Sequence, residues 1–204
     1  MLDYWESALR VTGGEIAHEK SYWHLIDFKW TGNSWQYRTK ADIPGELHLP
    51  KGDDRSPSMI ARLEVTEARE LLGLMICPDG KEDDQFKSLL GKTKKWREAI
   101  RSNRIKQSGA WYCMNNTIMK TVEYPLMATT LSRPQLDKIM VPVLHGGLPQ
   151  SSVQCNMPRA IVYGSLHVQG LDVHHPYSSQ TIQHLQTIMR HATRPTITGG
   201  SLRN

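Results

Sequence analysis

The sequence predicts an α+β fold, in which a small antiparallel β region is followed by a helical bundle. Apolar residues recur at a period of about 2 before residue 80 and at a period of about 3.6 after it. The turn sequence Pro78-Asp79-Gly80 separates the two patterns. At 204 residues the chain is long enough for one domain or two small ones.

The region before this turn is expected to begin with a helix and continue as short strands. Residues 1–12 have the spacing of an amphipathic helix that ends at Gly13-Gly14. Its apolar side contains Leu2, Trp5, Leu9 and Val11. Turn residues at 31–34 join the aromatic stretches 21–30 and 35–39, which predicts a β-hairpin. Further strands are expected at 46–49, 58–65 and 71–77, with a polar loop at 51–55.

The region after the turn has the periodicity of helices. The first helix has an apolar side made of Phe86, Leu89, Leu90, Thr93, Trp96, Ala99 and Ile100. A second is expected at 108–123, ending or kinking at Pro125. A third begins at Ser132, where Gln135 completes a capping box. It is expected to bend at Pro142 and to stop at Gly146-Gly147, before a final helix at 180–190.

Basic residues occupy the other side of the first of these helices. Eight of them lie between Phe86 and Gln107, against the single acid Glu98. They are Lys87, Lys92, Lys94, Lys95, Arg97, Arg101, Arg104 and Lys106. The net charge of +5 predicts an acidic partner, and a patch of this density suits phosphates. Steps of three and four residues place Lys94, Arg97, Arg101 and Arg104 on one solvated stripe. A solvated helix face without a ligand is the alternative.

Several kinds of protein are excluded by what the sequence lacks. No apolar run reaches about 18 residues, and no signal peptide is recognisable at the N-terminus, so we expect no membrane partner and an intracellular location, nuclear or cytoplasmic. The three cysteines form no C-x-x-C pair, which argues against a disulfide framework or a thiolate zinc site. Phosphate-loop and G-x-S-x-G sequences are missing, so kinase and ordinary hydrolase chemistry have no support.

No metal site or cofactor is expected within the chain. Polymerase chemistry needs carboxylates that converge on two Mg²⁺ ions about 4 Å apart. The pairs Asp53-Asp54 and Asp83-Asp84 lie among charged residues, and the second pair suits the first turn of a helix. The nine histidines include His174-His175, but no H-E-x-x-H sequence is present, so surface or hydrogen-bonded histidines are favoured.

Taken in order, several of these segments resemble the reverse transcriptases of retrotransposons without long terminal repeats. Thr12-Gly13-Gly14 followed by residues 20–26 is similar to the segment after the catalytic Asp-Asp turn of that family. Residues 71–76 with Pro78-Asp79-Gly80 resemble the Leu-Gly strand that supports the primer terminus. The basic helix with Trp96 and residues 117–125 resemble the thumb, and residues 158–160 and 170–173 resemble the segment after the thumb.

The resemblance implies a division into residues 1–80 as the C-terminal part of a palm, 81–149 as a helical thumb and 150–204 as a connection segment. It implies RNA-directed DNA synthesis, a nucleotidyltransferase activity that uses Mg²⁺, for the intact protein. The catalytic carboxylates and the fingers would lie upstream of Met1. The chain is therefore expected to be a fragment that does not polymerise alone, with an RNA–DNA or DNA duplex and the missing palm and fingers as partners.

The resemblance also implies roles for single residues. Lys20 would act as a general acid toward the pyrophosphate leaving group, although an exposed structural lysine is the alternative. Leu72, Gly73 and Leu74 would position the primer end. Lys92, Lys94, Lys95, Arg97, Arg101 and Arg104 would hold the duplex backbone. Two other interpretations stay open, a stand-alone non-catalytic nucleic-acid-binding or interaction module and a degenerate relic.

Overall fold

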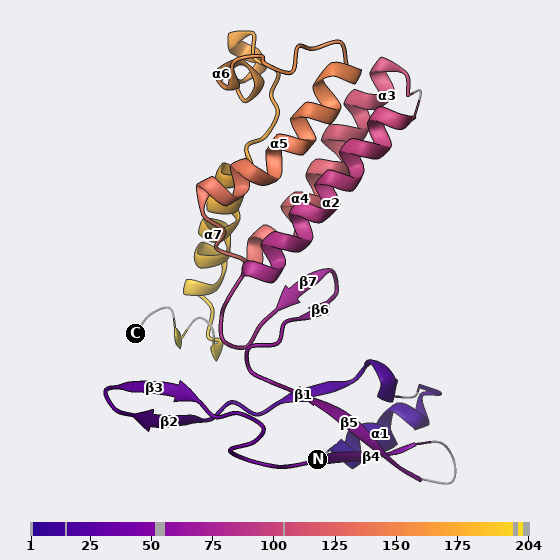
Figure 1. Cartoon of the computed structure of the whole chain (residues 1–204), viewed down its shortest axis with the longest axis vertical. Coiled ribbons are helices and arrows are strands. Elements are labelled where there is room, and N and C mark those ends of the chain that lie inside the picture. Colours follow the sequence, from indigo (N-terminus) through magenta and orange to yellow (C-terminus); the bar gives the residue numbers. More distant parts are fainter. Residues whose placement is uncertain (1, 15, 52–55, 104, 198–199, 202–204) are drawn as a thin grey trace. The chain divides into compact units, whose positions relative to one another are not determined.

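A computed structural model describes residues 2–14, 16–51, 56–103, 105–197 and 200–201 of the chain, whose elements are labelled in Figure 1. The chain forms two compact units. The first contains residues 1–69 and 76–81, and the second contains residues 70–75 and 82–204. About 52% of the chain is helix and 15% is strand, which confirms the α+β class.

The first unit begins with helix α1 (Leu2–Val11), which ends before Gly13 at a φ of 79°. The predicted apolar side of this helix is wrong at two positions, since Trp5 is 65% exposed and Val11 is 89% exposed. Glu6 is buried instead, and Arg10 one turn later compensates its carboxylate at 3.2 Å. The periodicity of the sequence therefore predicted the helix but not the side that it buries.

A three-stranded sheet forms the centre of the first unit, in the order β1 (Tyr22–His24), β5 (Ser56–Leu63) and β4 (Leu47–Lys51). The strands predicted at 46–49 and 58–65 are thus confirmed, and they pair antiparallel with Leu47 opposite Ile60. The pair β1–β5 is parallel, so the sheet is mixed rather than wholly antiparallel. Four residues of the predicted polar loop, 52–55, lie outside the described residues.

The predicted hairpin at residues 21–39 is confirmed for its second half, as strands β2 (Phe28–Thr31) and β3 (Ser34–Tyr37). Gly32 has a φ of 64°, as expected for a two-residue turn with glycine in its first central position. Alternation along the strands places four aromatic rings on one face, Phe28 opposite Tyr37 and Trp30 opposite Trp35. Trp30 and Trp35 contact edge to face, with ring centroids 5.0 Å apart.

The apolar run at residues 71–77 forms a hairpin, not the single strand that was predicted. Strands β6 (Arg69–Leu71) and β7 (Leu74–Ile76) are joined by Leu72 and Gly73, whose φ angles are 52° and 85°. Positive φ at both central residues is typical of a type I′ turn, which a leucine rarely enters. The turn predicted at residues 78–80 is confirmed, because the Gly80 amide donates to the carbonyl of Cys77 at 3.0 Å.

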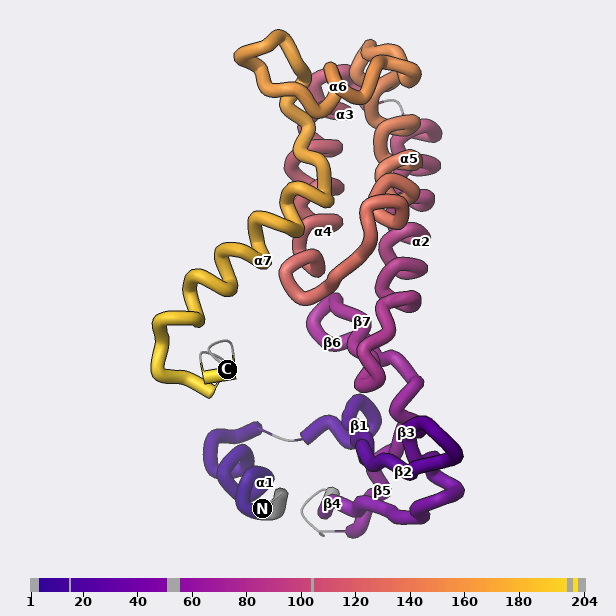
Figure 2. Tube along the Cα trace, turned by 90° about the vertical axis from the view of Figure 1, so that its left-hand side faces the viewer, coloured from indigo at the N-terminus to yellow at the C-terminus, as the bar shows by residue number. Residues whose placement is uncertain are grey.

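The second unit is a helical bundle. It contains the two clusters of buried apolar residues that are found among the described residues. Helix α2 (Asp83–Ser102) packs along helix α5 (Arg133–Gln150), and the two run side by side in Figures 1 and 2. The predicted helix at 108–123 is present, but it contains a π-helical segment between α3 and α4. Its parts are α3 (Gln107–Tyr112), η2 (Cys113–Ile118), α4 (Met119–Glu123) and the 3₁₀ turn η3 (Tyr124–Ala128).

Helix α5 begins as predicted but does not stop where predicted. The side-chain carbonyl of Gln135 accepts hydrogen bonds from the Ser132 amide at 2.9 Å and hydroxyl at 2.8 Å. The helix continues through Pro142 and past Gly146 and Gly147, both of which are buried. These glycines allow close packing rather than helix termination, because a Cβ on Gly146 would lie 3.1 Å from the Cα of Arg97 in α2.

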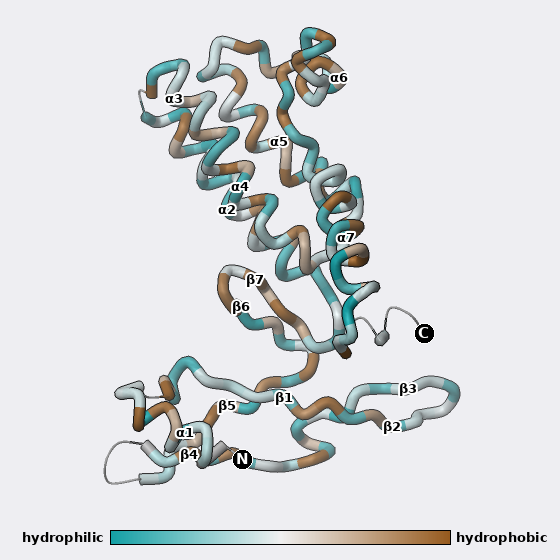
Figure 3. Tube along the Cα trace, turned by 180° about the vertical axis from the view of Figure 1, so that it is seen from behind, coloured by the Kyte–Doolittle hydropathy of each residue, from teal (hydrophilic) through white to brown (hydrophobic). Residues whose placement is uncertain are grey.

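Three shorter elements follow α5, namely α6 (Arg159–Val162), η4 (Leu166–Val168) and α7 (Pro176–Ala192). Helix α7 confirms and extends the helix predicted at 180–190. Four of its apolar residues are exposed, namely Ile182, Leu185, Ile188 and Met189. Figure 3 shows brown, apolar positions along α7. Among the described residues, no helix has both the length and the apolar character needed to cross a bilayer.

Candidate functional site

Helix α2 presents opposite sides to the core and to solvent. Leu89, Thr93 and Ile100 are buried, which places one side of the helix in the bundle. Lys94, Lys95 and Arg101 are exposed on the other side, as the sequence predicted. No carboxylate in the described part of the chain lies within 4.0 Å of these three cations. We term Lys94, Lys95 and Arg101 the basic face.

Two other lysines of α2 are engaged with acidic residues. Lys87 pairs with Asp84 at 3.3 Å in the first helical turn, where carboxylates also complement the helix dipole. Lys92 approaches Glu70 of strand β6 at 3.9 Å. Both pairs are exposed and contribute little to stability. Lys92 is therefore less available for a phosphate than the residues of the basic face.

Arg97 does not lie on the solvated stripe expected for it. The residue is half-buried, and its Cα, Cβ and Cγ lie against Gly146 of α5. Its Nε is buried without a hydrogen-bond partner among the described residues. The helical step of three from Lys94 turns Arg97 toward α5, because the bundle covers more of α2 than its apolar residues indicate. Arg104 lies outside the described residues.

The remaining predicted site residues lie in turns, except for Leu74. Lys20 is the last residue of the 3₁₀ turn η1 (His18–Lys20) in the first unit and is exposed. Leu72 forms the tip of the β6–β7 hairpin and is 83% exposed, while Gly73 faces the ring of Tyr124, where a Cβ would lie 3.6 Å from its Cε1. Leu74, which begins strand β7, is half-buried.

The described residues contain no group of three histidine, cysteine, aspartate or glutamate side chains that could hold a metal ion. Asp83 and Asp84 occupy the first turn of α2, as expected, and Asp53-Asp54 lies outside the described residues. Several histidines have hydrogen-bond partners, as expected for structural residues. The Nε2 of His184, for example, lies 3.0 Å from the carbonyl oxygen of Leu126.

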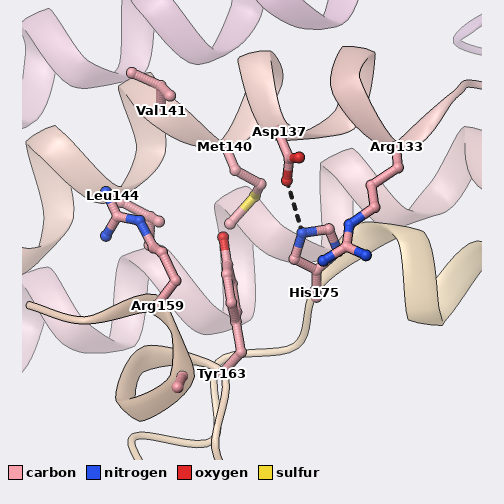
Figure 4. Close-up of a pocket in the computed structure, with 9 residues that line it drawn as sticks. Arg133, Asp137, Met140, Val141, Leu144, Arg159, Tyr163 and His175 are labelled. Carbon is pink, nitrogen blue, oxygen red and sulfur yellow. Dashed lines mark hydrogen bonds and ion pairs between the residues drawn. The ribbon is translucent and has the colours of Figure 1, made fainter.

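A second candidate site is a pocket of about 430 Å³ between α5, α6 and the start of α7 (Figure 4). Helix α5 contributes Arg133 and Asp137 together with an apolar wall. Helix α6 and the residue that follows it contribute Arg159 and Tyr163. The ninth lining residue is His175, which caps helix α7; the others are Met140, Val141, Leu144 and Ala160.

His175 joins two of the elements that line this pocket, because both of its ring nitrogens form hydrogen bonds. Its Nδ1 accepts a hydrogen bond from the Tyr177 amide at 3.1 Å, and its Nε2 lies 2.9 Å from Oδ1 of Asp137. Since the amide can only donate, Nδ1 must carry no proton, so Nε2 carries it and donates to Asp137. The ring also contacts Tyr163 edge to face, with centroids 4.6 Å apart.

The two arginines of the pocket lie on opposite sides of the Tyr163–His175 pair (Figure 4). Neither guanidinium has an ion-pair partner in the described ranges, and Nη1 of Arg159 is buried without a hydrogen bond. Burial raises the pKa of the Tyr163 hydroxyl above its ordinary value of 10.0, an effect that nearby Arg159 reduces. The hydroxyl therefore stays protonated as a donor.

Only one regularity of the sequence points to this pocket. Arg133, Asp137 and Val141 follow one another at steps of four, so they share one side of the predicted helix. Arg159 and His175 join them through irregular segments whose path no periodicity predicts.

Comparison with known proteins identifies no relative of the chain. It matches no family model, no curated protein and no solved structure at a significant level. Its geometry and its sequence pattern are therefore the basis for a functional proposal.

Proposed function

We propose that the chain is the C-terminal part of a retroelement reverse transcriptase, which holds a template-primer duplex through the basic face of α2 and does not polymerise alone. The observation that carries this proposal is that Lys94, Lys95 and Arg101 are exposed on one side of a helix whose other side is buried, and have no carboxylate partner among the described residues. Unpaired guanidinium and ammonium groups are the ordinary means of binding phosphates.

The spacing of the basic face suits a nucleic-acid backbone. At a rise of about 1.5 Å per residue, Lys94 and Arg101 are separated by about 10 Å along the helix axis. Such a separation serves different phosphates rather than one. Contacts of this kind position a duplex without selecting its sequence, which is what a polymerase requires.

The packing of α2 supports the same proposal. Gly146 and Gly147 bring α5 close to α2 and to the π-helical segment, so the helix that carries the basic face is tightly packed in the bundle. A rigid support limits the side-chain and backbone ordering that binding would otherwise require.

Lys20 and the β6–β7 turn receive roles only in the intact polymerase. Lys20 would serve as a general acid, and Leu72, Gly73 and Leu74 would contact the primer end, once an upstream palm and fingers are present. The Mg²⁺ ligands would likewise belong to that upstream palm.

The test measures binding of the 204-residue chain to a fluorescent RNA–DNA hybrid and to a DNA duplex by anisotropy, over a series of salt concentrations. We expect dissociation constants on the order of 10⁻⁴ to 10⁻⁶ M at physiological salt. The double variant Lys94→Ala/Arg101→Ala should reduce the slope of log K against log salt by about 2, equally for all sequences.

The matched control is Lys138→Ala/Arg190→Ala, which removes the same charge from exposed positions of α5 and α7. This control should leave most of the slope unchanged. Equal losses in both double variants would indicate general attraction to a basic protein, and absence of binding would overturn the proposal.

A further inference from the structure

The pocket between α5, α6 and α7 contains a cation without a counter-charge. Nη1 of Arg159 is buried and makes no hydrogen bond to any described residue. A buried polar group that lacks a partner destabilises the fold, and more so when it is charged. Among the described residues, Asp137 is the only carboxylate that lines the pocket, and it is already bonded to His175. The Arg159 end of the pocket therefore favours an anion.

A second donor lies at the same end. In Figure 4 the Tyr163 hydroxyl points toward Met140, with Arg159 on one side of it and the Asp137–His175 pair on the other. Because burial raises its pKa, this hydroxyl keeps its proton and can donate to a bound oxygen. A guanidinium fork and a hydroxyl together offer donors to several oxygens of one group, which matches the geometry of a phosphate.

The other end of the pocket has a different character. There Arg133 and Asp137 bring opposite charges to the lining, and the second carboxylate oxygen of Asp137 can accept a hydrogen bond from a hydroxyl or amino group. Met140, Val141 and Leu144 supply an apolar wall beside it. The volume of about 430 Å³ falls in the range of small-molecule sites. A sugar and a flat base fit this combination better than a second anionic group does.

We propose that this pocket binds a nucleoside monophosphate group, with its phosphate on Arg159 and the Tyr163 hydroxyl and its nucleoside toward Asp137 and the apolar wall. The group comes either from a free nucleotide or from the 5′-phosphate end of a strand. The site uses none of the residues of the basic face, so its test is independent of the test of the proposed function.

Calorimetric titration of the whole chain with AMP and with adenosine tests the site. AMP should bind about 10- to 100-fold more tightly than adenosine, the range expected for hydrogen bonds to a charged group. Arg159→Met should abolish this preference while leaving adenosine binding nearly unchanged. A purely structural role of Arg159 would instead weaken both ligands alike. Tyr163→Phe should weaken AMP by about 2- to 10-fold.

Two control variants test whether the AMP preference depends on the guanidinium of Arg159. Arg159→Lys keeps the charge without the fork, so AMP binding should fall between that of the native chain and Arg159→Met, and circular dichroism checks that each variant folds. Lys138→Ala, on α5 but outside the pocket, should change nothing. Equal affinity for AMP and adenosine, or loss of AMP binding in Lys94→Ala/Arg101→Ala, would overturn the assignment.

The source of the phosphate is resolved with short oligonucleotides. A 5′-phosphorylated tetranucleotide that competes with AMP, when its 5′-hydroxyl counterpart does not, identifies a strand end as a ligand. Failure of both to compete identifies the free nucleotide. Either result supports the pocket, provided that Arg159→Met removes the AMP preference.

Discussion

Gly147 of α5 approaches Met114 so closely that a Cβ on the glycine would lie 2.5 Å from the methionine Sδ. Met114 is fully buried and belongs to the π-helical segment η2. One residue earlier, Gly146 makes a comparable approach to Arg97 of α2. Helix α5 thus meets α2 and η2 through glycines, and any side chain at position 147 must displace a core residue.

Gly147→Ala is therefore expected to destabilise the second unit, although alanine favours a helix over glycine. Overpacking of a core costs about 1–3 kcal/mol, more than the helix propensity returns. The matched control is Gly91→Ala in α2, where a Cβ would meet nothing within 4 Å. That substitution should raise the free energy of unfolding by up to about 1 kcal/mol. Urea denaturation followed by circular dichroism compares them, and stabilisation by both changes would refute the packing argument.

His175 is expected to stabilise α7 mainly as its N-cap. Replacement by alanine leaves the Tyr177 amide without its acceptor and should lower the free energy of unfolding by about 1 kcal/mol. Asparagine is a good N-cap residue, so His175→Asn should restore most of that loss even though the bond to Asp137 disappears. Hydrogen exchange at the first amides of α7 measures the effect. Equal losses in both variants would instead assign the stabilisation to the Asp137 bond.

The carboxyl of Asp79 is expected to make the stability of the first unit decrease in acid. Burial opposes ionisation of its carboxyl, but hydrogen bonds from Cys77 and from the Lys81 amide, with the Lys81 ammonium, outweigh it and lower the pKa from 3.8 to about 2. Because the folded pKa is depressed, the ionised group stabilises the fold above about pH 4, and this contribution is lost as the pH falls from 4 to 2.

The variant Asp79→Asn should accordingly be less stable at pH 7 and lose less stability between pH 4 and pH 2 than the native chain. Asp27→Asn serves as the control, since the Asp27–Arg38 pair is exposed and contributes little. Urea denaturation at each pH gives the free energies. A native and a variant curve that stay parallel through this range would contradict the role of Asp79.

The β2–β3 hairpin is expected to open more readily than the bundle. It is an isolated two-stranded sheet, and three of the aromatic residues on its shared face, Phe28, Trp30 and Trp35, are each at least 46% exposed. Hairpins of this kind are marginally stable alone. Amide exchange at residues 28–37 should therefore be faster than at residues 136–148 of α5, where most apolar side chains are buried. Uniformly slow exchange would show that this hairpin has a complete core of its own.

The helices were largely predictable, because their periodicity and caps are local properties. Ser132 and Gln135 located the start of α5 before any tertiary contact was considered. The prediction that the helix stops at Gly146-Gly147 was wrong. A glycine pair that stops a helix and one that allows a neighbouring helix to approach closely look alike in sequence. The turn at Leu72 was missed for a similar reason, because leucine has no preference for positive φ and tertiary structure imposes it.

The candidate sites also differ in whether local sequence patterns predict them. The basic face follows from helical spacing, so Lys94, Lys95 and Arg101 were found correctly as exposed cations of α2. Arg97 was misplaced because the buried arc of a helix depends on its neighbours. The pocket with Arg159 and His175 depends on the path of irregular segments, which a single sequence does not reveal.

The contact between Trp30 and Trp35 gives the hairpin an optical label. Two indoles held edge to face at 5.0 Å couple their electronic transitions, and such coupling produces a paired circular-dichroism band that isolated tryptophans lack. Among the described residues, no aromatic ring contacts Trp96 or Trp111, the tryptophans of the second unit. Loss of the paired band on heating thus reports melting of β2–β3 alone, while helical ellipticity in the same spectrum follows the bundle.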